Sequence, residues 1–115
     1  MRYLLLLHSR GPELRDHSPE WMEEATAFLA RFDDELAMRS ELEWSEVLAP
    51  ASRGRIIGAD GTETTAESDA AAPVTRVWVV RVADAARALA LGGELARRLG
   101  ARVDVRECLP SAQMP

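Results

Sequence analysis

Glu46 is the carboxylate whose position best suits proton transfer. It shares one face of an alternating stretch with three apolar side chains, Leu42, Trp44 and Leu48. If that face is buried, desolvation raises the pKa of the carboxyl and makes Glu46 a plausible general base. The alternative is a salt bridge from Glu46 to Arg76 or Arg81 across the sheet.

His8 is the second candidate for acid–base chemistry. It ends an apolar run, on the same parity as Leu4 and Leu6. An imidazole at the mouth of a pocket can serve as a base or a ligand, since its ordinary pKa is about 6.5. The alternative is a strand-end histidine that is half-exposed or hydrogen-bonded to the backbone. We favour the alternative, because a chain with two histidines has few ways to build a site.

Two tryptophans and two arginines are candidates for ligand binding. Trp44 and Trp78 are predicted on the same face of a sheet, where they would floor a pocket or, as we favour, fill an interface core. Arg76 and Arg81 have opposite parities on one stretch, so only one of them can face the interior. Either arginine could hold an anionic ligand, and the alternative for each is an ordinary surface arginine.

Composition excludes several classes of protein. Cys108 is the only cysteine, which rules out an intramolecular disulfide, and with two histidines it makes a zinc site improbable. The net charge of −5 argues against a nucleic-acid surface. Neither a targeting signal nor a membrane-spanning apolar stretch is evident. We expect a cytoplasmic protein without metal or cofactor.

The elements that must position these residues follow from periodicity. The apolar run at 3–8 predicts a strand. Ser18 is placed to cap a helix over 19–39, with Pro19 in its first turn and an apolar stripe at spacings of three and four. The alternating stretch 42–50 predicts a strand that ends at Pro50. A short strand over 53–58 leads to a turn at Asp60 and Gly61, and 62–73 is predicted to be mostly loop.

The second half of the chain repeats this pattern. β-Branched and aromatic residues predict a central strand over 74–82. Asp84 caps a second helix, and Gly100 follows its end. The predicted inward face of that helix consists of Ala85, Ala88, Leu89, Gly92, Leu95, Ala96 and Leu99. A last strand is predicted over 102–108.

This order of elements predicts a two-layer α+β sandwich of the ferredoxin-like type, with helices on one face of a mostly antiparallel sheet. Residues 1–109 form its single domain, and 110–115 form a frayed tail. The second face of the sheet would leave a large apolar patch exposed. We therefore expect a homodimer in which two sheets pack face to face.

The chain also resembles the YCII-related proteins, in the branch named for an Asp-Gly-Pro-Phe motif. The opening residues 1–7, the helix start at 18–22 and the last two strands resemble that branch, and Glu46, Leu48 and Pro50 match its Gly-Gly-Glu-x-Leu-x-Pro pattern. Residues 65–71 read Thr-Ala-Glu-Ser-Asp-Ala-Ala where the naming motif is expected. The histidine of the proposed helical dyad in better-known members is absent from the first helix.

The resemblance implies a dimeric α/β barrel, of which some members are thought to be enzymes. Three functions are compatible with the residues. The first is a non-enzymatic dimer that binds a small molecule at its interface. The second is a cofactor-independent enzyme that uses Glu46 or His8 as general acid or base. The third is a structural interaction module that docks through its acidic helix face.

Overall fold

Apolar residues fill successive positions of β1 (Arg2–His8) and β5 (Val74–Arg81), and these two become the central strands of an antiparallel sheet. The computed structural model describes residues 1–9, 17–68 and 72–110. Its main sheet has four strands in the order β2 (Leu42–Val47), β5, β1 and β6 (Val103–Glu107). The fold is α+β, and its described residues form two helices, this sheet and a separate two-stranded hairpin. The predicted strands of the sheet are confirmed.

The two helices begin and end where the sequence predicts. The Ser18 hydroxyl accepts a hydrogen bond from the Trp21 amide at 3.1 Å and caps α2 (Pro19–Met38). Asp84 accepts from the Arg87 amide at 2.9 Å and caps α3 (Ala85–Leu99). Gly100 follows α3 with a φ of 60°, a left-handed conformation that glycine adopts without steric cost.

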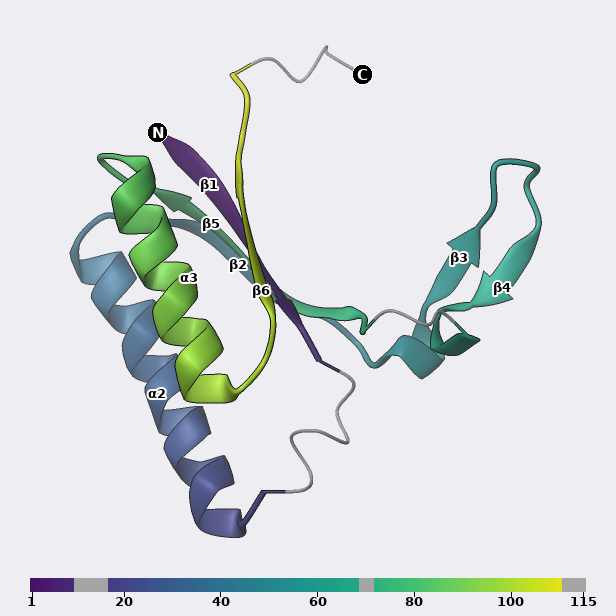
Figure 1. Ribbon diagram of the computed structural model, residues 1–115, viewed down its shortest axis with the longest axis horizontal. Coiled ribbons are helices and arrows are strands. Elements are labelled where there is room, and N and C mark those ends of the chain that lie inside the picture. The colour runs from purple at the N-terminus through teal and green to yellow at the C-terminus, as the bar shows by residue number, and fades with distance from the viewer. Residues whose placement is uncertain (10–16, 69–71, 111–115) are drawn as a thin grey trace.

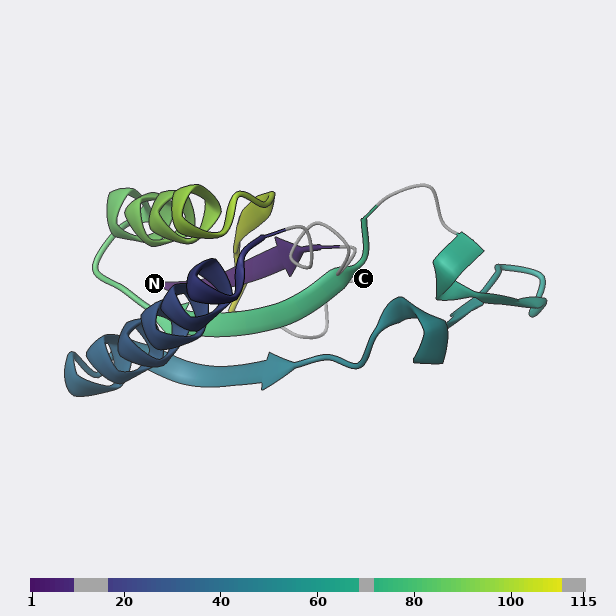
Figure 2. The same ribbon diagram turned by 90° about the horizontal axis from the view of Figure 1, so that it is seen from below.

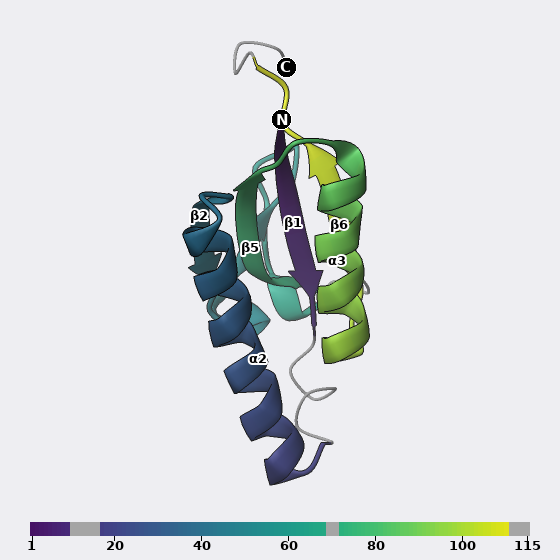
Figure 3. The ribbon, with the colours of Figure 1, turned by 90° about the vertical axis from the view of Figure 1, so that its left-hand side faces the viewer.

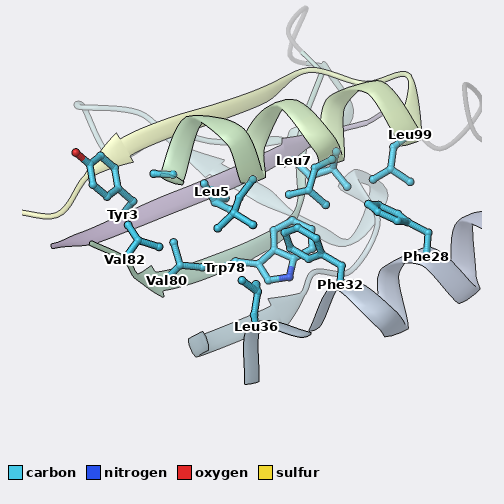
Figure 4. Close-up of a cluster of buried hydrophobic side chains, with 13 residues drawn as sticks. Tyr3, Leu5, Leu7, Phe28, Phe32, Leu36, Trp78, Val80, Val82 and Leu99 are labelled. Carbon is cyan, nitrogen blue, oxygen red and sulfur yellow. The ribbon is translucent and has the colours of Figure 1, made fainter. Parts of the chain in front are cut away.

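Both helices lie on the same side of the sheet (Figures 1 and 3). Between the two layers lies the core, which Figure 4 shows in detail. Leu5 of β1, Trp78 of β5 and Leu95 of α3 are completely buried there. The Trp78 ring meets Phe32 of α2 edge to face, with ring centroids 5.7 Å apart.

The inward face of α3 differs from the prediction at three positions. Ala85 and Leu89 are exposed, whereas Leu91 is buried. Gly92 marks the closest approach of α3 to the sheet, because a Cβ added there would lie 2.5 Å from Cγ2 of Val105. The helix therefore packs on β6 through a small-residue contact, as predicted, but is rotated relative to the predicted stripe.

A hairpin of β3 (Arg55–Ile57) and β4 (Glu63–Thr65) leaves the body of the molecule after β2. Short 3-10 helices flank it, η1 (Ala51–Arg53) and η2 (Ala66–Ser68). The predicted turn is confirmed by Gly61, whose φ is 85°. The prediction of mostly loop over 62–73 missed two short elements, β4, which pairs with β3, and η2, whereas 62, 72 and 73 lie outside regular structure. Residues 69–71 of this stretch lie outside the described residues.

The hairpin projects on the side of the sheet opposite the helices (Figures 1 and 2). It gives the chain a radius of gyration of 15.5 Å, compared with about 13 Å for a compact domain of this length. Ile56 and Ile57 of the hairpin are exposed. The hairpin thus carries apolar side chains that this chain does not cover.

The predicted frayed tail lies outside the described residues from position 111 onward. Within the described part of the chain, neither helix is long and apolar enough to cross a membrane.

Candidate functional site

The candidate site is the face of the main sheet that the helices leave uncovered, here called the open face. It carries the side chains of alternate residues on each strand: Arg2, Leu4, Leu6 and His8 of β1, Val77, Val79 and Arg81 of β5, Trp44 and Glu46 of β2, and Asp104 and Arg106 of β6. Their strand neighbours point into the core on the other side.

Strand register arranges the centre of the open face in two rows across the sheet. One row runs Trp44, Val79, Leu4, Arg106. The next runs Glu46, Val77, Leu6, Asp104. Each row therefore has two aliphatic residues in its middle and polar or aromatic residues on the outer strands. An apolar floor with charged margins is the pattern of an interface core with a polar rim.

Glu46 lies on the open face beside Val77, exposed to solvent. It has no hydrogen bond or ion pair with any residue in the described part of the chain. The predicted salt bridges to Arg76 or Arg81 are not formed, because each arginine binds another carboxylate. The Glu46 carboxylate is therefore exposed and unpaired among the described residues.

The prediction that Trp44 and Trp78 share a face is wrong. Trp44 lies on the open face and is 49% exposed, whereas Trp78 is fully buried on the opposite face. There its indole Nε1 donates to Oδ1 of Asp33 on α2 at 2.7 Å. A pocket floor on the open face therefore has Trp44 alone. Leu42 also leaves the predicted face, because an irregularity in the pairing between Leu42 and Trp44 shifts the register.

The two arginines of β5 lie on opposite faces, as their parity predicts. Arg76 points toward α2 and donates to Oδ2 of Asp33 at 2.9 Å, with its guanidinium over the Trp78 ring. Arg81 lies at one end of the open face, where Glu43 accepts from Arg2 at 2.7 Å and lies 3.6 Å from Arg81. The Arg2 guanidinium accordingly lowers the pKa of Glu43.

His8 lies at the other end of the open face, between the Ala72 carbonyl and the Asp104 carboxylate. Its Nδ1 lies 3.0 Å from the carbonyl oxygen of Ala72, so this nitrogen carries the hydrogen and donates it. Its Nε2 is shielded from solvent and lies 3.3 Å from Oδ2 of Asp104, outside hydrogen-bond geometry. Neither nitrogen is presented to a substrate. The arrangement favours the backbone-bonded strand-end histidine over a general base.

Asp104 and Arg102 complete the His8 cluster, and sequence reasoning missed both. Arg102 donates to the two carboxylate oxygens of Asp104 at 2.8 and 3.1 Å. This guanidinium lowers the pKa of Asp104, and His8 adds a smaller effect in the same direction. The alternation of Asp104 with Val103 and Val105 indicates its face, but only the β1–β6 register reveals that His8 is its neighbour.

A small apolar pocket exists elsewhere, between the first half of α2 and the ends of β1 and α3. It has a volume of about 90 Å³, and Leu7, Trp21, Met22, Leu29 and Leu99 contribute to its walls. Ligand pockets usually measure at least roughly 300 Å³, so this one is too small for a substrate. It contains none of the predicted site residues.

Metal binding finds no support in the described residues, among which no three His, Cys, Asp or Glu side chains group closely enough to share an ion. Comparison with protein-family models finds no match, and no curated protein matches the sequence either. The resemblance to the YCII-related proteins stays a prediction from the residues quoted above.

Proposed function

We propose that this chain is a homodimer of the ferredoxin-like, dimeric α/β-barrel type, which binds a small apolar molecule between its two paired sheets. The observation that carries the proposal is the open face, an aliphatic sheet surface over which no helix or strand of the described residues lies. Full burial of an exposed aliphatic side chain is worth roughly 1.5–3 kcal/mol, and a cover would add the part of this that belongs to the surface still exposed on each of these residues. A second sheet is the cover whose shape fits, since sheets pack face to face at about 10 Å.

The sheet order supports the fold in this proposal. Strands β2, β5, β1 and β6 follow one another across the sheet, all neighbours are antiparallel, and α2 and α3 connect β1 to β2 and β5 to β6. This is the connectivity of a split β-α-β arrangement of the ferredoxin-like type. The resemblance to the Asp-Gly-Pro-Phe branch of the YCII-related proteins implies the same fold.

The hairpin supports a second copy as the occupant. It stands on the open-face side of the sheet (Figures 1 and 3), with Ile57 61% exposed. Val47 and Leu48, at the start of the connection to it, are exposed as well. A partner seated on the open face would lie beside this projection and could cover its apolar side chains.

An enzyme on the same scaffold would need Glu46 and His8 to converge. Glu46 shares a row with Leu6, and His8 lies one two-residue step further along β1, two strands away from β2. Strand spacings of about 4.8 Å and a rise of about 3.4 Å per residue put the two backbones about 12 Å apart. Because the Nδ1 of His8 is bonded to the Ala72 carbonyl and its Nε2 is shielded from solvent, binding is the better-supported function.

Sedimentation velocity tests the dimer. We expect the wild type to sediment as a particle of twice the 12.7 kDa chain mass. The variant Val77→Glu, which adds a charge to the centre of the open face, should be a monomer with an unchanged circular dichroism spectrum. The matched control Leu89→Glu adds the same charge on the exposed side of α3 and should remain a dimer. A monomeric wild type contradicts the proposal.

Titration with the apolar dye 1-anilinonaphthalene-8-sulfonate tests the binding site. The dimer should bind the dye saturably with an increase in fluorescence. Val77→Phe, which enlarges a side chain on the floor between the sheets, should weaken dye binding while leaving the dimer intact, and Leu89→Phe should not. Equal binding by both variants would place the dye elsewhere and overturn the small-molecule part of the proposal.

A further inference from the structure

Most charges on the open face are already paired inside the chain. Glu43 is held by Arg2 and Arg81 at one end, and Asp104 is held by Arg102 and His8 at the other. Two charged side chains of the open face have no ion pair or hydrogen bond with the described residues: Glu46 and Arg106. Both lie on the outer strands of the open face, so a sheet packed on that face would bury them or place them at the rim of the interface.

Glu46 and Arg106 cannot satisfy each other within one chain. Glu46 lies on β2 and Arg106 on β6, the two outer strands of the sheet. Three strand spacings of about 4.8 Å separate those strands, or about 14 Å. Along the strands the two residues are only one row apart, because Glu46 shares a row with Leu6 and Arg106 shares one with Leu4.

A charge at a dimer interface costs free energy unless it finds a partner there. A two-fold axis that runs along the strands turns β2 of one copy over β6 of the other and leaves each row at the same level. Glu46 then lies over Asp104 of the second copy, which Arg102 already pairs, and Arg106 of that copy lies one row away, about 7 Å along the strand. This happens twice, once for each copy. A two-fold axis that runs across the strands turns β2 over β2 and β6 over β6. That arrangement keeps Arg106 of either copy about three strand spacings, or about 14 Å, away from Glu46 across the sheet.

We propose that Glu46 forms an ion pair with Arg106 of a second copy, in two symmetry-related instances, and that these pairs set the two-fold axis of the dimer along the strands. The inference rests on the dimer proposed above and adds its orientation. A two-fold interface requires this reciprocity, in which residue i contacts residue j and j contacts i. In this proposal Glu46 helps to hold the two copies together and selects the orientation in which they pair.

Charge reversal tests the pairing. We expect Glu46→Arg and Arg106→Glu each to raise the dimer dissociation constant by about tenfold or more, since reversal places like charges opposite each other at two sites. The double variant Glu46→Arg with Arg106→Glu should restore the constant to within about threefold of the wild type. The control Glu35→Arg, which reverses an exposed charge on α2, should have no effect.

Cysteine cross-linking tests the axis independently. In a Cys108→Ser background, a mixture of the Glu46→Cys and Arg106→Cys chains should cross-link to each other with a short bifunctional maleimide. Each variant alone should cross-link poorly. Efficient cross-linking of Glu46→Cys with itself would overturn the inference, because it places β2 over β2.

The outcomes separate the two proposals. A wild-type monomer overturns both. A wild-type dimer whose constant is unmoved by the single reversals, or is not restored in the double variant, overturns the Glu46–Arg106 pair alone and leaves the sheet-to-sheet dimer standing.

Discussion

The two faces of the main sheet are built from the same strands, but the side chains on one face are buried within the chain and those on the other are only partly buried. On the covered face, Leu5, Trp78 and Val80 have no exposed surface, because α2 and α3 lie over them. On the open face, their neighbours Leu4, Leu6, Val77 and Val79 are as apolar but keep part of their surface exposed. Strands that are apolar on both faces are typical of sheets buried on both sides. One cover is supplied by α2 and α3, and in the proposed dimer a second sheet supplies the other.

Charges on the two faces differ in the same way. On the covered face, Asp33 of α2 accepts from both Arg76 and Trp78 of β5, so every charge in this group has its partner in the chain. On the open face, Glu46 and Arg106 have no such partner among the described residues. The covered face is a core packed within the chain, whereas in the proposed dimer the open face is half of an interface.

The largest expected effect comes from breaking the covered face at Trp78. Trp78→Ala should lower the free energy of unfolding by about 3–5 kcal/mol, through lost burial and the cavity left between α2 and β5. It also leaves Asp33 with one donor fewer. Urea denaturation monitored by circular dichroism measures the change.

Trp44→Ala is the matched control on the open face. At protein concentrations where only monomer is present, it should cost less than about 1 kcal/mol, since Trp44 is half-exposed in the single chain. At higher concentration it should weaken the dimer. Equal losses of monomer stability for the two tryptophans would contradict the distinction between the faces.

The sequence was sufficient for the two helices with their ends and for the four strands of the main sheet, but not for β4. Ser18, Asp84 and Gly100 act through local hydrogen bonds or local backbone conformation, and these depend on residues within a few positions along the chain. The position of each strand of the main sheet was likewise predictable from short-range patterns. Helix caps and strand positions can be predicted from a single sequence because they depend on residues close together in the chain.

The assignment of faces could not be predicted from the same patterns. Val77 and Val79 are as apolar as Trp78 and Val80, so the alternation of β5 does not say which side the helices cover. The irregularity between Leu42 and Trp44 then breaks the parity of β2. The partnership of His8 with Asp104 depends on the register between β1 and β6. Each of these is set by contacts between residues far apart in the chain.

A smaller effect is expected at the contact between α3 and β6. Gly92→Ala should lower the free energy of unfolding by about 1–3 kcal/mol, because the new Cβ would overlap Cγ2 of Val105 and push α3 away from the sheet. The neighbouring Gly93→Ala is the control. Its Cβ meets only the flexible end of Arg97, so the helix propensity of alanine should make it neutral or stabilising by up to about 1 kcal/mol.

Thermal unfolding of the two alanine variants compares them directly. A drop in melting temperature for Gly92→Ala with none for Gly93→Ala is expected. Losses of the same size in both variants would indicate that the close approach of α3 to the covered face does not limit packing. The dimer constant should be unchanged in both, because the two glycines lie on the opposite side of the sheet from the open face.

The smallest expected effect is on the stability of the fold at acid pH. Two glutamate–arginine pairs contribute to it, Glu41 with Arg87 of α3 and Glu43 with Arg2 on the open face. Arg87 of α3 donates to both carboxylate oxygens of Glu41 at 3.0 and 2.9 Å, and this hydrogen-bonded guanidinium lowers the pKa of Glu41. Arg2 lowers the pKa of Glu43 on the open face in the same way. The Glu41 side chain is 13% exposed and that of Glu43 is 34% exposed, so solvent screens the Glu43 pair more strongly.

A carboxyl whose pKa is lower in the folded state than in the unfolded state stabilises the fold above its ordinary pKa, and this stabilisation is lost as the pH falls through the folded value. Glu41→Gln should therefore cost about 1 kcal/mol at neutral pH, and its difference from the wild type should shrink as the pH falls below about 4.5. Glu43→Gln should show the same direction with a smaller change. Urea titrations at a series of pH values measure both. A difference that grows toward acid pH would mean that the Glu41–Arg87 pair between β2 and α3 does not act as an ion pair.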